Sequence, residues 1–413
     1  MKATKNEPLP AAKGSPGLGR GGIALAGVGL TLTLLALLAD GGLVAVGYGY
    51  LWGYALVWSI VVGSLLFVGL QHLTHARWSV VLRRVPEMLS SPLWLVALLF
   101  VPVLAFALLH DRFHLFPWAD AELMASDHLL HEKSPYLNLP FFVIRAVLFF
   151  ALWLFFERLF VGTSLAQDQG KVGAEATLRL RRWSSALVAL FGVTITFAGI
   201  DWLMSLSPKW FSTMFGVYVF AGMFSSSLAA ITLAVVWMKR SGRLGEGWIR
   251  DDQLYSLGVL LFAFVCFWAY IAFSQFMLIW YGNLSEETFY YEQRTTGGWL
   301  VLSVVLALLR FVLPFLLLLP RPSKTNPRVL VPVSLMLLVG QAVDLYWLIA
   351  PQMDANVPDA LLVSGALRPL LMLGPVLLLG GLVLHQIARF LKKHPPMPVG
   401  DPLLEASRRY IHL

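Results

Sequence analysis

The fold is indicated most clearly by the apolar run GWLVLSVVLALLRFVLPFLLLL at residues 298–319. This run of hydrophobic residues contains a single charged side chain, Arg310. A helix of this length is about 33 Å long, slightly more than the roughly 30 Å of hydrocarbon in a bilayer. Since lipid offers no hydrogen-bond partners to the backbone, such a run must satisfy its own peptide groups as a helix. The stretch therefore predicts a transmembrane helix.

Nine further apolar runs fill most of the remaining chain. Of its 413 residues, 58% are hydrophobic and 13% are charged, whereas a soluble domain has roughly 25% charged residues. Mean hydropathy is +0.72. The ten predicted spans are residues 22–38, 50–71, 93–110, 139–160, 183–204, 210–238, 254–281, 298–319, 329–350 and 362–390. We therefore predict an all-α integral membrane protein, with no soluble domain that could bind nucleic acid.

Basic residues predict the orientation of this protein. They gather in residues 1–21, in the connections around 77–84, 171–182, 239–250 and 321–328, and from residue 389 onward. The intervening connections together hold only Arg112, Lys133, Lys209 and Arg294. Cytoplasmic connections carry the excess of Lys and Arg, so we predict both termini to be cytoplasmic. Residues 1–21 would form a flexible tail, 22–391 the membrane domain in halves of about 22–206 and 207–391, and 392–413 a second cytoplasmic tail.

Residue types that bind redox centres are scarce. The chain has one cysteine, Cys266, no C-x-x-C-H segment, and only His385 well inside a predicted span. Iron–sulfur clusters and covalent haem need cysteines, so we predict no redox centre in this chain. In the connection at 111–134, the spacings His110/His114 and His128/His131 suit zinc. No four-ligand set accompanies them, so we predict no metal and expect a partner-docking surface there.

Polar residues within the spans are candidates for function, because burying them in lipid is costly. Candidates for a proton path or a quinone-proximal site are His72, His75, Glu157, Asp201, Asp344, Gln341, Tyr270 and Ser274; candidates for charge compensation are Arg145, Arg310 and Arg368. By depth, Arg145, Asp201, Asp344 and Arg368 form an outer layer, whereas His72, His75, Glu157 and His385 form an inner one. Two readings stay open: proton exchange in two half-channels, or structural pairing of Asp201 and Asp344 with the arginines.

Three motifs carry a resemblance to a known family. They are LQHLTHARWSVVLRR at residues 70–84, DWLMSLSPKWFSTMFGVY at 201–218 and IWYGNLSEET at 279–288. They resemble the NrfD-like (polysulfide-reductase) membrane subunits of bacterial alternative complex III, in particular the ActF type. By that resemblance, helices 2–5 and 6–9 form two four-helix bundles, with helices 1 and 10 peripheral. His72, His75 and Asp201 are the candidates that lie in the motifs.

The resemblance implies a multi-subunit quinol:cytochrome c oxidoreductase in the bacterial inner membrane. The expected partners are a sister NrfD-like subunit, a periplasmic iron–sulfur subunit, c-type cytochromes that hold haem c, and lipids. This chain would then form a proton path and scaffold and have no catalytic residue, with quinone or menaquinone as the possible ligand. Two alternatives remain: the chain binds quinone itself, or it is a proton-coupled secondary transporter. Against the transporter, Pro102, Pro314 and Pro375 occupy unrelated positions in the two halves, unlike the paired helix breaks of inverted repeats.

Overall fold

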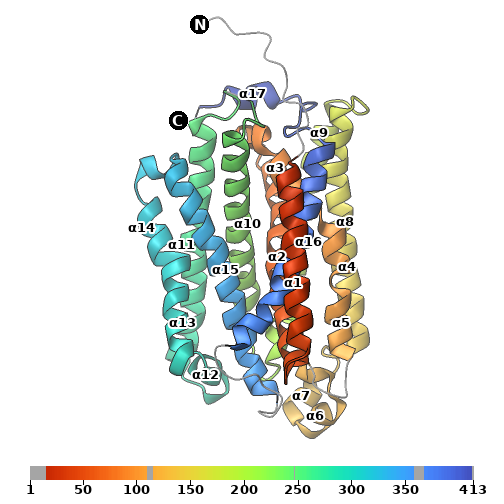
Figure 1. The fold of residues 1–413 in the computed structure, drawn as a ribbon, viewed down its shortest axis with the longest axis vertical. Coiled ribbons are helices and arrows are strands. Elements are labelled where there is room, and N and C mark those ends of the chain that lie inside the picture. Colours follow the sequence, from red (N-terminus) through yellow and green to blue (C-terminus); the bar gives the residue numbers. More distant parts are fainter. Residues whose placement is uncertain (1–14, 109–114, 246, 358–366, 412–413) are drawn as a thin grey trace, which may run out of the picture.

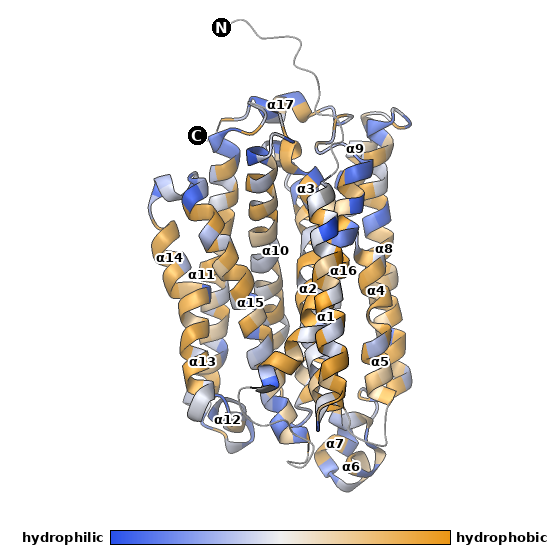
Figure 2. Cartoon of the chain, in the orientation of Figure 1, coloured by the Kyte–Doolittle hydropathy of each residue, from blue (hydrophilic) through white to orange (hydrophobic). Residues whose placement is uncertain are grey.

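A computed structural model describes residues 15–108, 115–245, 247–357 and 367–411, which form helices and no strands. Ten helices in this part of the chain are long and apolar enough to cross a membrane. They run side by side along the long axis of the molecule (Figure 1). Hydrophilic residues gather at the two ends and hydrophobic residues cover the helical flanks (Figure 2). The protein is therefore an all-α, multi-pass membrane protein.

The first five spans comprise α1 (Pro16–Leu37), α2 (Gly42–Leu73), the run α3 (Arg84–Ser90), α4 (Leu93–Leu98) and α5 (Val101–Leu108), then α8 (Leu139–Asp168) and α9 (Glu175–Trp202). The last five comprise α10 (Phe215–Arg240), α11 (Asp251–Gly282), the run α13 (Gly297–Ala307), η4 (Leu308–Val312) and α14 (Leu313–Leu318), then α15 (Pro327–Asn356) and α16 (Leu367–Lys393). Short helices α6 (Ala121–Ser126), α7 (His128–Lys133) and α12 (Ser285–Glu292) lie at one end, called the α12 end. The other, the α17 end, carries α17 (Leu404–Arg408).

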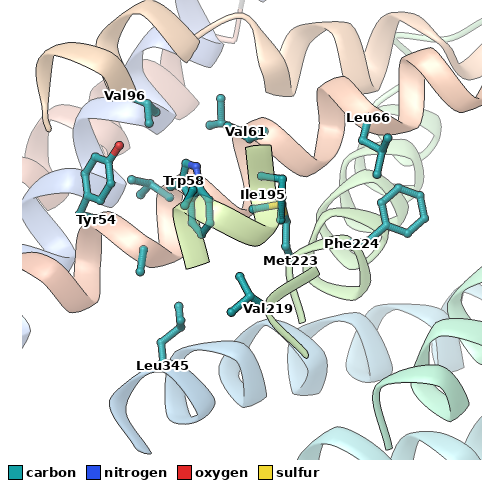
Figure 3. Packing of buried hydrophobic residues seen from close by; sticks show 14 of the residues in the cluster. Tyr54, Trp58, Val61, Leu66, Val96, Ile195, Val219, Met223, Phe224 and Leu345 are labelled. Carbon is teal, nitrogen blue, oxygen red and sulfur yellow. The ribbon is translucent and has the colours of Figure 1, made fainter. Parts of the chain in front are cut away.

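Helices α2 and α10 pack against each other at the centre of the molecule. Gly63 leaves room for Ser227, whose hydroxyl donates to the Ser59 carbonyl over 3.0 Å. Around this contact, Trp58 and Met223 meet side chains from α9 and α15 (Figure 3). We call the spans α2 to α9 the first bundle and α10 to α15 the second, following the grouping that the resemblance implies; α2 contacts α9 of its own bundle and α10 and α15 of the other.

Helices α1 and α16 form a separate pair that packs against α2. Glycines bring the two backbones into contact: a Cβ at Gly29 would lie 2.2 Å from the Leu378 nitrogen, and one at Gly381 would lie 2.4 Å from the Ala26 nitrogen. Small residues at a helix interface allow this close approach in membranes. The imidazole Nδ1 of His385 lies 3.2 Å from the Gly19 carbonyl oxygen in the same interface. The predicted candidate His385 thus belongs to the α1–α16 contact.

Several predicted boundaries are wrong. The first helix begins at Pro16 rather than residue 22, which shortens the predicted tail. The third span begins at Arg84 and breaks into three helices, because Pro92 and Pro102 lack the amide hydrogens that would continue the ladder. Residues 109–110 and 362–366, which the predicted spans also included, lie outside the described residues.

The C-terminal segment packs on the α17 end of the bundle. Ser407 accepts a hydrogen bond of 3.0 Å from the Val81 amide, and its carbonyl accepts one of 2.9 Å from the Gln253 side chain. Asp401 forms a buried ion pair with Arg83. Residues 394–411 therefore link the segment between α2 and α3, which holds Val81 and Arg83, to the start of α11.

Candidate functional site: two buried arginine–aspartate centres

Asp344 on α15 lies at the centre of a buried polar cluster in the second bundle. Its side chain is 2% exposed and that of Arg310 is 1% exposed, and the Arg310 Nη2 to Asp344 Oδ2 distance is 3.8 Å. The Tyr218 hydroxyl donates to one carboxylate oxygen, and the Trp268 indole donates to the other over 3.1 Å. Asp344 therefore has a cation and two hydrogen-bond donors around it, as a buried carboxylate requires.

Gln341 joins Arg310 to the centre of the molecule. Its side-chain oxygen accepts a hydrogen bond from Arg310, and its amide group donates to Ser59 on α2 over 3.4 Å. Gln341 and Asp344 lie one helical turn apart on α15, as the sequence predicts. The Arg310 guanidinium also lies over the Trp268 ring, 4.5 Å from its centre. The cluster thus connects α2, α10, α11 and α15 with the eighth span.

A π-helical turn, η4, places Arg310 in this cluster. The turn covers Leu308–Val312, and Pro314 follows, which cannot donate to the Arg310 carbonyl four residues earlier. Such turns insert one extra residue into a helix and often mark functional sites. Gly340 makes room for the arginine, since a Cβ there would lie 2.7 Å from the Arg310 Cδ. The Nε of Arg310 has no hydrogen-bond partner among the described residues.

An apolar groove of about 520 Å³ leads from the flank of the bundle to this cluster. Its walls come from α11 and α13, and include the small residues Ala272 and Ala307. Phe273 and Val304, at 62% and 53% exposed, lie on the flank that faces lipid. At its inner side the groove reaches Tyr218 and Trp268, the two donors to Asp344. A ligand in the groove would therefore meet the polar cluster through these two side chains.

Arg294 closes the α12 end of the groove. Its side chain is fully buried, and its three nitrogens donate to the carbonyls of Tyr290, Trp347 and Leu348 over 2.7–3.1 Å. The guanidinium lies 3.6 Å from the centre of the Tyr290 ring. Burial lowers the pKa of Arg294 from its ordinary value, but an arginine is still charged near pH 7. From its sequence position Arg294 was predicted only to be a cation in a connection, and its burial beside the groove was not predicted.

Asp201 occupies a matching centre in the first bundle. It is fully buried and accepts two hydrogen bonds from Arg145, of 2.7 and 3.0 Å. The Tyr136 hydroxyl donates to the same carboxylate over 2.7 Å. Burial raises the pKa of Tyr136, which therefore stays protonated as a donor. The bidentate geometry favours the structural reading for Asp201.

The two centres occupy corresponding places in the two bundles. In each bundle the arginine lies on the third span and the aspartate on the fourth: Arg145 and Asp201 in one, Arg310 and Asp344 in the other. They differ in geometry, since Arg145 meets its partner at 2.7 Å and Arg310 at 3.8 Å. Asp344 is thus the less tightly paired of the two carboxylates.

Other predicted candidates lie apart from both centres. Tyr270 is 66% exposed on the outer side of α11, and Ser274 lies on the same helix without contacting Asp344. Arg368 pairs with Asp354 over 2.6 Å rather than with Asp201 or Asp344. Arg368 therefore compensates a different carboxylate from the two predicted ones, and the predicted outer layer, which was defined by depth alone, stays a prediction.

The histidines at the end of α2 differ from each other. His72 is buried against Phe160, with ring centres 5.4 Å apart, and its Nε2 has no hydrogen-bond partner among the described residues. His75 is exposed and has a positive φ of 53°, just past the end of α2. Residues in this conformation commonly end helices. Glu157 lies near the α17 end beside Arg158, and no hydrogen bond between described residues joins these three candidates to Asp201 or Asp344.

A buried ionic network that was not predicted lies at the α17 end. Glu87 is fully buried and accepts hydrogen bonds from Arg83, Arg84 and Ser164. Arg84 also forms an ion pair with Asp168 on α8. The spacing of Arg83, Arg84 and Glu87, three and four residues apart, is the signal that could have revealed this network.

No group of three or more His, Cys, Asp or Glu side chains gathers as metal ligands within the described ranges. Of the spacings that suit zinc, His110 and His114 lie outside those ranges, and His128 is exposed, 3.8 Å from Glu132. No protein-family model matches the chain, and no curated protein sequence matches it.

Proposed function

We propose that this chain is a membrane subunit of a respiratory quinol:electron-acceptor oxidoreductase of the alternative complex III kind. The ten spans, the basic α17 end and the three motifs at 70–84, 201–218 and 279–288 support the proposal. The chain would lie in a bacterial inner membrane with its α17 end in the cytoplasm. Haem c and iron–sulfur clusters would be held by partner subunits, so this chain is not expected to catalyse the reaction alone.

Within that complex, the role that the geometry supports best is quinone binding in the groove between α11 and α13. The observation that carries this role is the position of Tyr218 and Trp268, which face the groove and both donate to the buried Asp344. A quinone needs an apolar slot for its ring and tail, and polar groups that fix its head. The groove offers the slot, and Tyr218 and Trp268 offer the polar groups.

The chemistry of quinol oxidation fits this arrangement. Oxidation releases two electrons and two protons, so a quinol hydroxyl needs a proton acceptor while the electrons pass to clusters on partner subunits. Tyr218 can accept a proton from the quinol as it passes its own proton to Asp344. Arg310 stabilises the ionised form of Asp344 before the transfer.

A photoreactive quinone analogue tests the groove in the purified complex. We expect labelled peptides from residues 268–276 and 303–311, and loss of the label when excess quinone competes. Labelling confined to other subunits, or to other parts of this chain, would contradict quinone binding here. That result would leave membership of the complex intact, which copurification with a multihaem cytochrome and an iron–sulfur protein in mild detergent tests separately. Isolation of this chain as a lone oligomer would favour a secondary transporter.

The second candidate role is a proton path through the chain. The buried carboxylates Asp201 and Asp344 favour it. Internal water would have to join them to Glu157 and His72, since no direct hydrogen bond between described residues does so. Asp201→Asn and Asp344→Asn should each preserve assembly and lower the proton-to-electron ratio of the complex in vesicles. An unchanged ratio in both variants would refute the path.

A further inference from the structure

A second groove lies at the α17 end, between α8 and α16, outside both arginine–aspartate centres. Its volume is about 390 Å³, and it is lined by Arg158 and Gly162 from α8, Arg389 and Lys393 from α16, and Ser91 after α3. The residues of α8 that line the groove lie between Glu157 and Leu165, within about three turns of the end of α8 at Asp168, and the lining of α16 includes its last residue, Lys393. The groove therefore lies near the α17 ends of these two spans.

Positive charge dominates this groove. Arg158, Arg389 and Lys393 are exposed, and none of them forms an ion pair with a carboxylate of the described residues. Glu157 is the one carboxylate in the lining, which leaves an excess of two positive charges. Burial lowers the pKa of His394, so this imidazole is neutral near pH 7 and adds no charge.

The spacing of these residues along α8 and α16 places the three cations on the walls of the same groove. Arg389 and Lys393 lie one turn apart on α16, and Arg158 and Gly162 lie one turn apart on α8. A Cβ at Gly162 would meet nothing within 4 Å, so the wall of α8 faces open space at this point. Apolar side chains of Val161, Leu165 and Phe390 complete the lining. The groove thus combines unpaired cations with an apolar floor, which matches a charged head joined to a hydrocarbon chain.

We propose that this groove binds the phosphate headgroup of an anionic phospholipid, with an acyl chain between α8 and α16. Arginine and lysine recognise phosphate oxygens through charge-assisted hydrogen bonds, and basic pockets between spans bind anionic headgroups. The position of the groove at the end of two spans favours a lipid over a free anion.

Native mass spectrometry of the intact protein tests the proposal with two charge-matched variants. The groove variant is Arg158→Gln/Arg389→Gln, and the control is Arg182→Gln/Arg240→Gln, which removes two exposed cations at the same end outside the groove. We expect phosphatidylglycerol to bind the groove variant at least about tenfold more weakly than the wild type, because each of the two arginines would donate charge-assisted hydrogen bonds to the phosphate oxygens. The control should bind within about twofold of the wild type, as a site-specific contact predicts.

Three results would overturn the proposal. If phosphatidylglycerol binding were weakened equally in both double variants, the attraction would be to a basic surface in general. If the wild type bound phosphatidylethanolamine as tightly as phosphatidylglycerol, the charge of the headgroup would be irrelevant. Binding of inorganic phosphate as tightly as phosphatidylglycerol would identify a free-anion site. Melting temperature without lipid checks folding of each variant. If the groove variant does not fold, Gly162→Leu fills the open space without changing charge, and it should weaken phosphatidylglycerol binding; unchanged binding would overturn the proposal.

Discussion

At the residue scale, Arg145, Arg310 and Arg368 have different surroundings although they are the same residue type. Arg145 meets a fully buried carboxylate in bidentate geometry, and Arg310 meets a buried one more loosely. Arg368 pairs with Asp354, whose side chain is 32% exposed. Removing one partner of a buried pair leaves an uncompensated charge, whereas water screens a partly exposed pair. The three arginines should therefore differ in their effects on stability.

We predict that Arg145→Met lowers the free energy of unfolding by about 3–5 kcal/mol, because Asp201 loses its cation within the bundle. The matched control Arg368→Met should cost about 1 kcal/mol or less, because its pair is partly exposed. Equilibrium unfolding in mixed micelles, followed by tryptophan fluorescence, measures both. Similar losses in the two variants would show that burial does not govern these pairs.

Sequence could predict these buried ions but not their pairings. Polar residues in apolar spans stand out in the sequence, so Arg145, Asp201, Arg310, Gln341 and Asp344 were all identified. Their partners depend on which helices are neighbours. Counting the Lys and Arg residues of a connection also does not show which of these side chains is buried in the protein. Arg294 shows this, because its partners are three backbone carbonyls, which a sequence does not mark as partners of a cation. Tyr218 was missed because a single tyrosine in an apolar helix resembles an ordinary packing residue.

At the scale of helices, the α1–α16 pair depends on small residues in a regular pattern. Gly22, Ala26 and Gly29 are buried on α1 at spacings of four and three, while the intervening residues are exposed except the half-buried Leu25. On α16, Gly374 and Gly381 face them seven residues apart. Van der Waals packing of small residues drives helix association in lipid. This pattern was readable from the sequence, whereas the π turn at Arg310 depends on tertiary packing and was not.

We predict that Gly29→Ala destabilises the α1–α16 pair by about 1–3 kcal/mol, because its Cβ would lie 2.2 Å from the Leu378 nitrogen. Gly27→Ala is the control on the same helix, where a Cβ meets nothing within 4 Å. It should be neutral or stabilise the protein by about 0.5–1 kcal/mol through helix propensity. Thermal unfolding in detergent compares the two variants. A loss of stability in Gly27→Ala as large as in Gly29→Ala would contradict backbone contact.

At the scale of the whole molecule, hydropathy predicted the ten spans well, because lipid imposes one length and one backbone geometry. The breaks at Pro92 and near Pro102 were the main error within a span. The arrangement of the helices came from the family resemblance, since hydropathy contains no information on neighbours. The C-terminal segment was predicted only as a tail, yet Ser407 and Asp401 bind the connection between α2 and α3, and Ser407 also binds α11.

Orientation in the membrane is testable with single cysteines in a Cys266→Ala background. We predict that Glu286→Cys, at the α12 end, reacts with an impermeant maleimide in intact spheroplasts. Lys171→Cys, at the α17 end, should react only after permeabilisation, because we propose that the basic end faces the cytoplasm. Reaction of Lys171→Cys in intact spheroplasts would invert the proposed topology.

We propose that the groove between α11 and α13 binds quinone beside Tyr218 and Asp344. Equilibrium binding of a quinone analogue to the purified complex tests this proposal, with Ala307→Trp in the groove wall and Ala151→Trp on the exposed flank of α8 as the control. We expect at least about tenfold weaker binding for Ala307→Trp, because the indole occupies the slot, and unchanged binding for Ala151→Trp. Equal affinity in the wild type and Ala307→Trp would refute quinone binding in this groove.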